Sequence, residues 1–257
     1  MSDLMGLAGL FFAGIAAGAI NSVAGGGTLI TFPSLVAFGQ PEIISNATNT
    51  AALWPGSLSS SLGYRKDTSV QRSLEITLAV PSLIGGLLGA MILVVTPAAA
   101  FKRVVPFLVL FATLVFALRE HLTRRFGGAS TGTECVTTMG RIRGFIFQLL
   151  IATYGGYFGA GIGILMLGSL SLMGLRDIHK INAIKALLAA IINVTAFVFF
   201  ALDGLVVWPL MILMATGSII GGYGGARLAK RVNPRLLYSF VVAVGVLVSA
   251  WLFVRSF

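Results

Sequence analysis

The segment NSVAGGGTLITFPSLVAFGQPEIISNATNTAALW, residues 21–54, decides the fold of this chain. It is apolar enough to lie in a membrane, yet it contains three consecutive glycines, a proline at position 33 and a cluster of small polar residues at 46–50. An uninterrupted transmembrane helix would have neither feature, because glycine weakens a helix and buried polar groups need partners. We therefore predict a broken, re-entrant element that faces a polar transmembrane helix and forms half of a binding site.

The composition of the whole chain identifies a helical membrane protein. Of its 257 residues, 57% are hydrophobic and 10% are charged, whereas a soluble domain carries about 25% charged residues. The apolar runs are long and rich in Leu, Ala, Val and Gly, which excludes the short alternating strands of a transmembrane β-barrel. We predict an all-α polytopic membrane protein embedded in a lipid bilayer.

The formal net charge of +10 does not indicate a nucleic-acid partner, because the basic residues fall in short loops between apolar segments, where they set membrane topology. One cysteine, Cys135, and two histidines, His121 and His179, cannot build a disulfide framework or a metal site, so we predict no metal and no cofactor. The N-terminal segment lacks the basic region of a signal peptide and carries Asp3, so we expect it to remain in the mature protein.

The chain contains an internal repeat. Residues 82–90, SLIGGLLGA, align with residues 218–226, SIIGGYGGA, at an offset of 136 residues and share six of nine positions. The same offset aligns Asn46 with Asn182, and it aligns residues 54–57 with residues 190–193. Glycine-rich membrane segments align by chance more often than other segments do. A constant offset from residue 46 to residue 90 of the first half is not expected by chance. We therefore predict two homologous halves.

We place these halves at residues 1–119 and 141–257, with a polar linker at 120–140 between them. The first apolar segment of each half is too long for one crossing, which takes about 20 residues, and it has glycines near its middle. Each half is therefore predicted to be a broken helical hairpin followed by three transmembrane helices. The apolar segments lie at residues 4–38, 46–64, 73–95, 98–118, 144–174, 181–202, 205–226 and 236–254.

The basic residues decide how the hairpins sit in the membrane. If each hairpin returns to the side it entered, 15 of the 18 Lys and Arg residues fall on one side, and only Lys102, Arg103 and Arg255 fall on the other. If each long segment crosses once, the same residues divide nine to nine. The strong cytoplasmic bias of natural membrane proteins favours re-entrant hairpins. Three crossings per half then make the halves inverted repeats, an architecture of secondary transporters, with both termini outside the cytoplasm and the linker inside it.

The glycine runs and the polar residues after them are the candidate binding elements. Irregular backbone at membrane depth survives only inside protein or beside a wet cavity, and a helix that restarts after it offers free N–H groups to an anion. The alternative is a tight turn that serves helix packing. The candidate binding residues are Asn21, Gly25, Gly26, Gly27, Thr28, Asn46, Asn49 and Thr50 in the first half, and Gly161, Gly163, Asn182 and Lys185 in the second.

Lys185 aligns with Asn49 of the first half. If its helix begins near Asp177, Lys185 lies about 12 Å into it at 1.5 Å per residue. All eight acidic residues fall in loops or near the ends of segments, so a lysine at this depth is expected to face a cavity or an anion. The alternative is that its side chain snorkels to the cytoplasmic face. Of these, we favour Lys185 as the group that offsets the charge of a bound anion.

With these motifs in view, the chain resembles the TauE/SafE sulfite-exporter family of bacterial membrane proteins. The resemblance rests on GAINSVAGGGTLITFPSLVAFG at residues 18–39, on NATNTAALWPGSLSSSLGYR at residues 46–65, and on the glycine-rich segment of the second half. It implies transport of sulfite, sulfonates or related organosulfur anions across the inner membrane. The second half departs from the pattern, because it has neither an NATN motif nor a proline at the position of Pro33.

We expect a secondary transporter, not an enzyme, that exports a small sulfur-containing anion from the cytoplasm and binds it at the midplane between the two hairpins. One alternative is an enzyme acting on a lipid head group, which would need a base, nucleophile or metal at depth that the sequence does not place there. The other is a membrane-embedded partner or scaffold subunit. The oligomeric state stays open, with a homodimer as one candidate.

Overall fold

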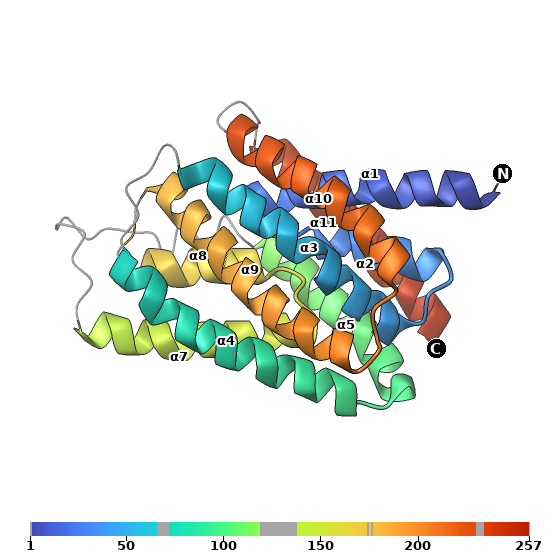
Figure 1. Cartoon of the computed structure of the whole chain (residues 1–257), viewed down its shortest axis with the longest axis horizontal. Helices are drawn as coiled ribbons and strands as arrows, with labels where there is room; N and C mark the ends of the chain where they lie inside the picture. The colour runs from blue at the N-terminus through green and yellow to red at the C-terminus, as the bar shows by residue number, and fades with distance from the viewer. Residues whose placement is uncertain are drawn as a thin grey trace.

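The computed structural model describes residues 2–65, 72–118, 138–173, 175, 177–229 and 234–256, and every regular element within them is a helix (Figure 1). The first five helices are α1 (Ser2–Val23), α2 (Thr28–Ala37), α3 (Glu42–Arg65), α4 (Arg72–Val95) and α5 (Ala98–Ala117). The next five are α7 (Thr138–Tyr157), α8 (Ile162–Leu172), α9 (Ile178–Leu202), α10 (Trp208–Leu228) and α11 (Pro234–Ser256). The predicted all-α class is confirmed. The predicted linker, residues 120–140, lies almost wholly outside the described residues.

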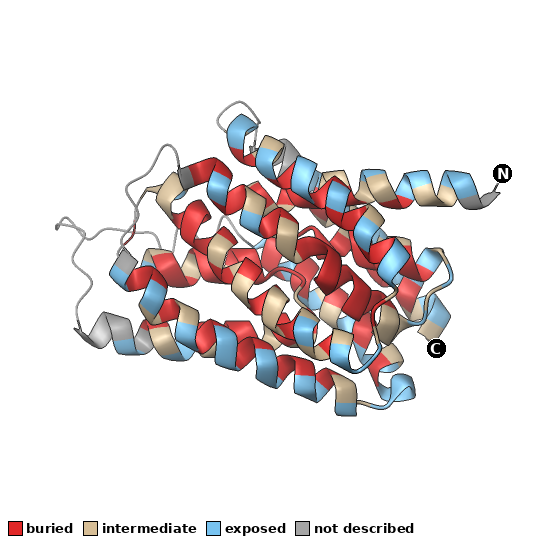
Figure 2. Ribbon diagram, in the orientation of Figure 1, coloured by how far each residue is buried: buried red, intermediate tan, exposed pale blue. Residues whose placement is uncertain are grey.

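Most of these helices have the length and the apolar surface of transmembrane helices. Six of them, α1, α4, α5, α9, α10 and α11, are long and apolar enough to cross a membrane. Figure 2 shows the exposed residues along the outer helices and the buried ones at the centre of the bundle. Large apolar side chains such as Phe107, Ile212 and Leu247 are at least half exposed. So much apolar surface on the outside of a bundle belongs in a bilayer, and the protein is a multi-pass membrane protein.

Helix α3 is about 36 Å long with its 24 residues, yet it is too polar to count among these six spans. Its polar side chains, among them Asn46, Thr48, Asn49 and Ser57, are buried. The helix packs against α9 and α10. Protein therefore covers these polar side chains of the helix that the sequence predicts after the first hairpin, while Leu58 and Leu62 of the same helix are exposed.

Both long apolar segments are broken at their glycines, as predicted. Residues 24–27 separate α1 from α2, and residues 158–161 separate α7 from α8. The ring of Phe38, just after α2, lies 2.7 Å from where a Cβ on Gly6 would stand, and Met173, just after α8, lies 2.5 Å from a Cβ on Gly144. Each hairpin thus returns to the start of its own first arm.

The arms of each hairpin are unequal, which the sequence did not indicate. The first hairpin has arms of 22 and 10 residues, and the second has arms of 20 and 11 residues. Helix α1 alone is about 33 Å long, which by length is enough to cross the hydrocarbon core of a bilayer.

The long arm of each hairpin packs against the other half of the chain. Helix α1 lies along α10, and α7 lies along α4. A Cβ on Gly221 would stand 1.9 Å from the carbonyl oxygen of Ile15, and a Cβ on Gly89 would stand 2.1 Å from that of Thr153, so glycine is required at both crossings. The halves interlock in this way, and their inverted relation stays a prediction.

Candidate functional site

The two helix breaks touch each other through their backbones. A Cβ on Gly25 would stand 2.3 Å from the Cα of Gly163, and a Cβ on Gly163 would stand 2.4 Å from the Cα of Gly25. Gly25 also has a φ of 83°, a conformation that residues with a side chain rarely adopt. The glycine run thus brings the backbone of one half against that of the other, at residues 138 positions apart in the chain (163 − 25).

Both short helices begin at this contact without a side-chain cap. The residues that precede α2 and α8, Gly27 and Gly161, make no capping hydrogen bond through a side chain. Within the ranges that the structure describes, no hydrogen bond is found from the backbone N–H of Thr28, Ile162 or Gly163. Uncapped N–H groups at the positive end of a helix dipole favour a negatively charged partner.

Asn21 bridges the first break from the last turn of α1. Its Oδ1 accepts a hydrogen bond from the N–H of Gly27 at 2.7 Å. One of the glycine amides predicted to face a ligand is therefore used inside the protein. The bond fixes the end of α1 against the start of α2.

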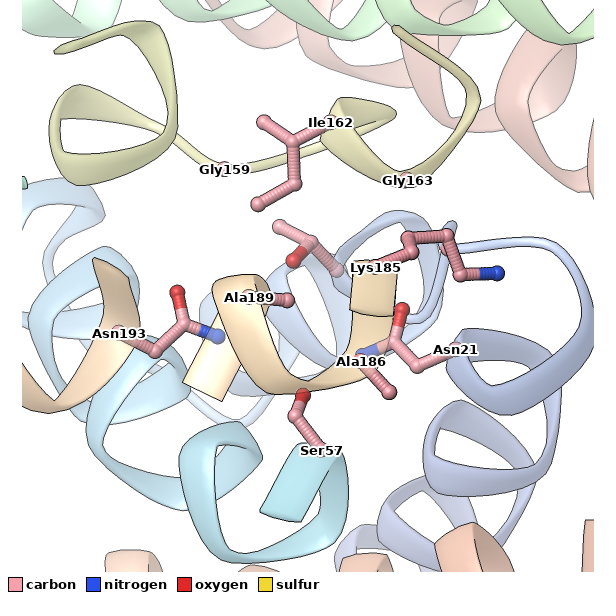
Figure 3. A pocket seen from close by; sticks show the side chains of 11 residues that line it. Asn21, Ser57, Gly159, Ile162, Gly163, Lys185, Ala186, Ala189 and Asn193 are labelled. Carbon is pink, nitrogen blue, oxygen red and sulfur yellow. The ribbon is translucent and has the colours of Figure 1, made fainter. Parts of the chain in front are cut away.

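A small pocket lies between the two breaks and the middle of α3 and α9 (Figure 3). Its free volume is about 20 Å³, and a single water requires about 10–15 Å³. The described conformation is therefore closed around the space of one water, and a larger ligand requires the breaks to separate. The pocket is lined by Asn21, Gly25, Thr28, Ser57, Gly159, Ile162, Gly163, Lys185, Ala186, Ala189 and Asn193.

Five of the candidate binding residues line this pocket: Asn21, Gly25, Thr28, Gly163 and Lys185. The remaining candidates lie outside its lining: Gly26, Gly27, Gly161, Asn46, Asn49, Thr50 and Asn182. Gly26 lies under the ring of Phe116, 2.1 Å from where a Cβ would stand.

The two asparagines of α3 hold one helix of each hairpin, α2 and α7, and are not in the lining of the pocket. Asn49 accepts a short hydrogen bond from the hydroxyl of Thr31, and its Nδ2 donates to the hydroxyl of Thr28 at 3.4 Å. Asn46 donates through Nδ2 to the carbonyl oxygen of Tyr157, the last residue of α7, at 2.9 Å. A carbonyl at the end of a helix has no partner within the helix, so Asn46 caps the second break.

Lys185 is buried, with 1% of its surface exposed. Its ammonium group donates to the Oδ1 of Asn182 at 2.8 Å and to the carbonyl oxygen of Ser22 at 3.4 Å. Ser22 belongs to the last turn of α1, where a positive charge is favoured by the helix dipole. Figure 3 shows that the stem of Lys185 borders the pocket and that its nitrogen lies to one side. The alternative, in which the side chain of Lys185 snorkels to the membrane surface, does not fit a buried ammonium group with these partners.

Asp177 caps α9, the helix that carries Lys185. Its carboxylate accepts hydrogen bonds from the N–H of His179 at 2.8 Å and of Lys180 at 3.4 Å. The predicted start of this helix near Asp177 is confirmed. Among the described residues, no group of three His, Cys, Asp or Glu side chains is arranged to hold a metal ion.

The candidate binding residues did not include six residues that complete the lining: Ser57, Gly159, Ile162, Ala186, Ala189 and Asn193. The internal repeat held a signal for two of them, because the offset of 136 residues aligns Ser57 with Asn193 and both are polar. Which face of α3 and α9 turns toward the breaks depends on tertiary packing, which the pattern of apolar residues in a buried helix does not reveal.

The family model for the sulfite exporter TauE/SafE matches residues 10–252. The chain belongs to the TauE/SafE family. A probable membrane transporter protein, ORF9, of a Sinorhizobium species is 32% identical over 93% of this chain and 89% of its own length. A probable membrane transporter protein of Haemophilus influenzae is 30% identical over 95% of this chain and 93% of its own.

The probable membrane transporter protein YfcA of Escherichia coli is 29% identical over 96% of this chain and 89% of its own length. No solved structure matches the chain. Family and relatives together show that this TauE/SafE protein is a membrane transporter and not an enzyme.

Proposed function

We propose that this transporter exports a small sulfur-containing anion, such as sulfite or an organosulfonate, from the cytoplasm across the inner membrane. The observation that carries the proposal is the meeting of two uncapped helix N-termini at one pocket. Both present N–H groups without a partner in the described part of the chain, and no carboxylate is among the residues that line the pocket. A small anion is the ligand that such a set of donors favours.

The sulfur chemistry of the substrate is supported by the family description, which names sulfite. The relatives are named only as probable transporters. The oxygens of a sulfite or sulfonate group would accept hydrogen bonds from the N–H groups of Thr28, Ile162 and Gly163. Lys185 would add a positive charge beside them, since its stem already lines the pocket.

We further propose that the two halves are inverted repeats with both termini outside the cytoplasm. In Figure 1 the two ends of the chain lie at the same end of the bundle, as this topology requires. The hydroxyl of Ser256 donates to the carbonyl oxygen of Lys102 at 3.2 Å, so the end of α11, which carries Arg255, lies beside the start of α5, which carries Lys102 and Arg103.

Export of an anion from a cell that is negative inside is electrically downhill, by about 2.3 kcal/mol per charge for each 100 mV. This electrical free energy favours export over uptake, and it can drive export without the coupled movement of a proton. The substrate would leave the closed pocket when the breaks separate, so that movement of the short arms α2 and α8 gives access to it.

Ligand-dependent stabilisation of the purified protein tests the proposal. Thermal unfolding is recorded with sulfite, sulfate, thiosulfate, sulfoacetate and taurine, and with chloride as the control anion. A ligand present at 100 times its Kd stabilises the folded protein by about 2.7 kcal/mol, so a true substrate raises the Tm clearly above the chloride value. A Tm that none of the sulfur compounds raises would contradict the proposed function.

A further inference from the structure

Ser57 and Asn193 face the pocket from equivalent positions in the two halves. Ser57 belongs to α3 and Asn193 to α9, and the repeat offset of 136 residues aligns them (193 − 57). Each follows the first residue of its helix, Glu42 or Ile178, by 15 positions (57 − 42 and 193 − 178), which places it near the middle of the bundle. Figure 3 shows the hydroxyl of Ser57 and the amide of Asn193 pointing toward the pocket.

Both side chains are buried, and neither has a hydrogen-bond partner among the residues that the structure describes. Asn193 is 8% exposed and Ser57 is 3% exposed. Across the described ranges, no hydrogen bond to either side chain is found. The polar atoms of these two side chains are not fully enclosed by protein, so they open onto the free space of the pocket. Because burying an unsatisfied polar group is costly, these two groups indicate a bound polar partner.

We propose that Ser57 and Asn193 bind the transported anion directly and restrict it to a compact species such as sulfite, an inference that rests on the proposed function above. The Ser57 hydroxyl and the Asn193 Nδ2 donate to the anion's oxygens. Each half of the chain then supplies one helix N-terminus and one polar side chain, so the anion is held from both sides.

The restriction in size follows from the rest of the lining. The pocket has a free volume of about 20 Å³, and the methyl groups of Ala186 and Ala189 lie on the same face of α9 as Asn193. When the breaks separate enough to admit a sulfur atom with three oxygens, a carbon substituent on that sulfur still meets these side chains. Asn193 therefore acts both as a hydrogen-bond donor and as a wall that disfavours larger sulfonates.

Affinities of the purified full-length protein for sulfite, methanesulfonate and sulfoacetate, measured by calorimetry, test this proposal. Asn193→Ala and Ser57→Ala each remove one hydrogen bond to a charged ligand, and each is expected to weaken sulfite binding about tenfold or more. Asn193→Ala also enlarges the pocket, so the ratio of sulfoacetate affinity to sulfite affinity is expected to rise. A purely structural role for Asn193 would lower all three affinities by the same factor and would overturn the proposal.

Two control variants separate contact with the anion from general effects on the helices. Ser60→Ala removes a buried hydroxyl of α3 that also has no partner but lies outside the pocket lining. Thr195→Ala removes a hydroxyl of α9 that donates to the carbonyl oxygen of Ile191. Both are expected to bind sulfite with wild-type affinity.

The failure of this proposal and that of the proposed function give different results. Wild-type protein that binds sulfite, with Asn193→Ala and Ser57→Ala variants that bind it equally well, overturns the role of the two residues and leaves the function intact. Wild-type protein that binds none of the three ligands overturns this proposal, and the proposed function falls with it only if sulfate, thiosulfate and taurine also leave the Tm unchanged. If Asn193→Ala does not fold, Asn193→Ser retains a hydroxyl in a smaller side chain and must show the same rise in the sulfoacetate-to-sulfite ratio.

Discussion

The contact between the two helix breaks makes a sharp prediction for Gly163→Ala. Gly163 lies in the first turn of α8, where Ala is favoured over Gly by up to about 1 kcal/mol on helix propensity alone. The new methyl group, however, would stand 2.4 Å from the Cα of Gly25 and 3.1 Å from the carbonyl oxygen of Ala24. Overpacking of this kind costs about 1–3 kcal/mol. The clash with backbone exceeds the gain in propensity, and a net loss of about 1–2 kcal/mol is expected.

Gly168→Ala is the matched control, because it makes the same change in the same helix where no atom lies within 4 Å of the added Cβ. It is expected to raise stability by up to about 1 kcal/mol. Thermal unfolding in detergent measures both, with about 2–4 °C of Tm for each kcal/mol. The variants should move the Tm in opposite directions. A Gly163→Ala protein that gains as much stability as Gly168→Ala would refute the contact between the breaks.

Three further substitutions have outcomes fixed by the contacts of the native side chains. Lys185→Ala removes the charge beside the pocket and is expected to abolish anion efflux from vesicles. The variant should stay folded, because the carbonyl oxygen of Ser22 also accepts a hydrogen bond from Tyr64, at 3.2 Å. Unchanged efflux would rule out the role of Lys185. Asn49→Ala removes one acceptor of the Thr31 hydroxyl, which still has the carbonyl oxygen of Gly27 at 3.0 Å, so the variant should lose the value of one net hydrogen bond, about 0.5–1.5 kcal/mol in chemical denaturation. No measurable loss of stability would contradict the bond between Thr31 and Asn49. Asp177→Ala removes the cap of α9 and should cost about 0.5–2 kcal/mol in the same assay, whereas Asp177→Asn should restore most of it.

The sequence predicted the broken hairpins well because their signals are local. Three consecutive glycines cannot continue a membrane helix without cost, and the break after α1 falls on them. The glycines shared by the two copies of the repeat, Gly85/Gly89 and Gly221/Gly225, each lie against the backbone or side chain of a neighbouring helix. Helix bounds also follow the apolar segments closely, since the thickness of a bilayer fixes the length of a span.

The partners of the polar residues could not be predicted in the same way. Asn46 and Asn49 are the most conspicuous polar residues in the chain, yet they hold α7 and α2 and leave the pocket to Ser57 and Asn193. Such contacts join residues far apart in sequence, for example 111 positions between Asn46 and Tyr157. A buried helix carries polar groups for structural capping and for ligand binding alike, and only the tertiary arrangement separates the two.

Efflux of radiolabelled sulfite from vesicles that contain the purified protein tests the central claim most directly. The label is loaded inside, and an inside-negative potential is imposed with a potassium gradient and valinomycin. Sulfite is predicted to leave these vesicles faster than protein-free vesicles, to leave faster still as the potential becomes more negative, and to be retained when Lys185→Ala replaces the wild type. Efflux from wild-type vesicles equal to that from protein-free vesicles, at every potential, would contradict the account.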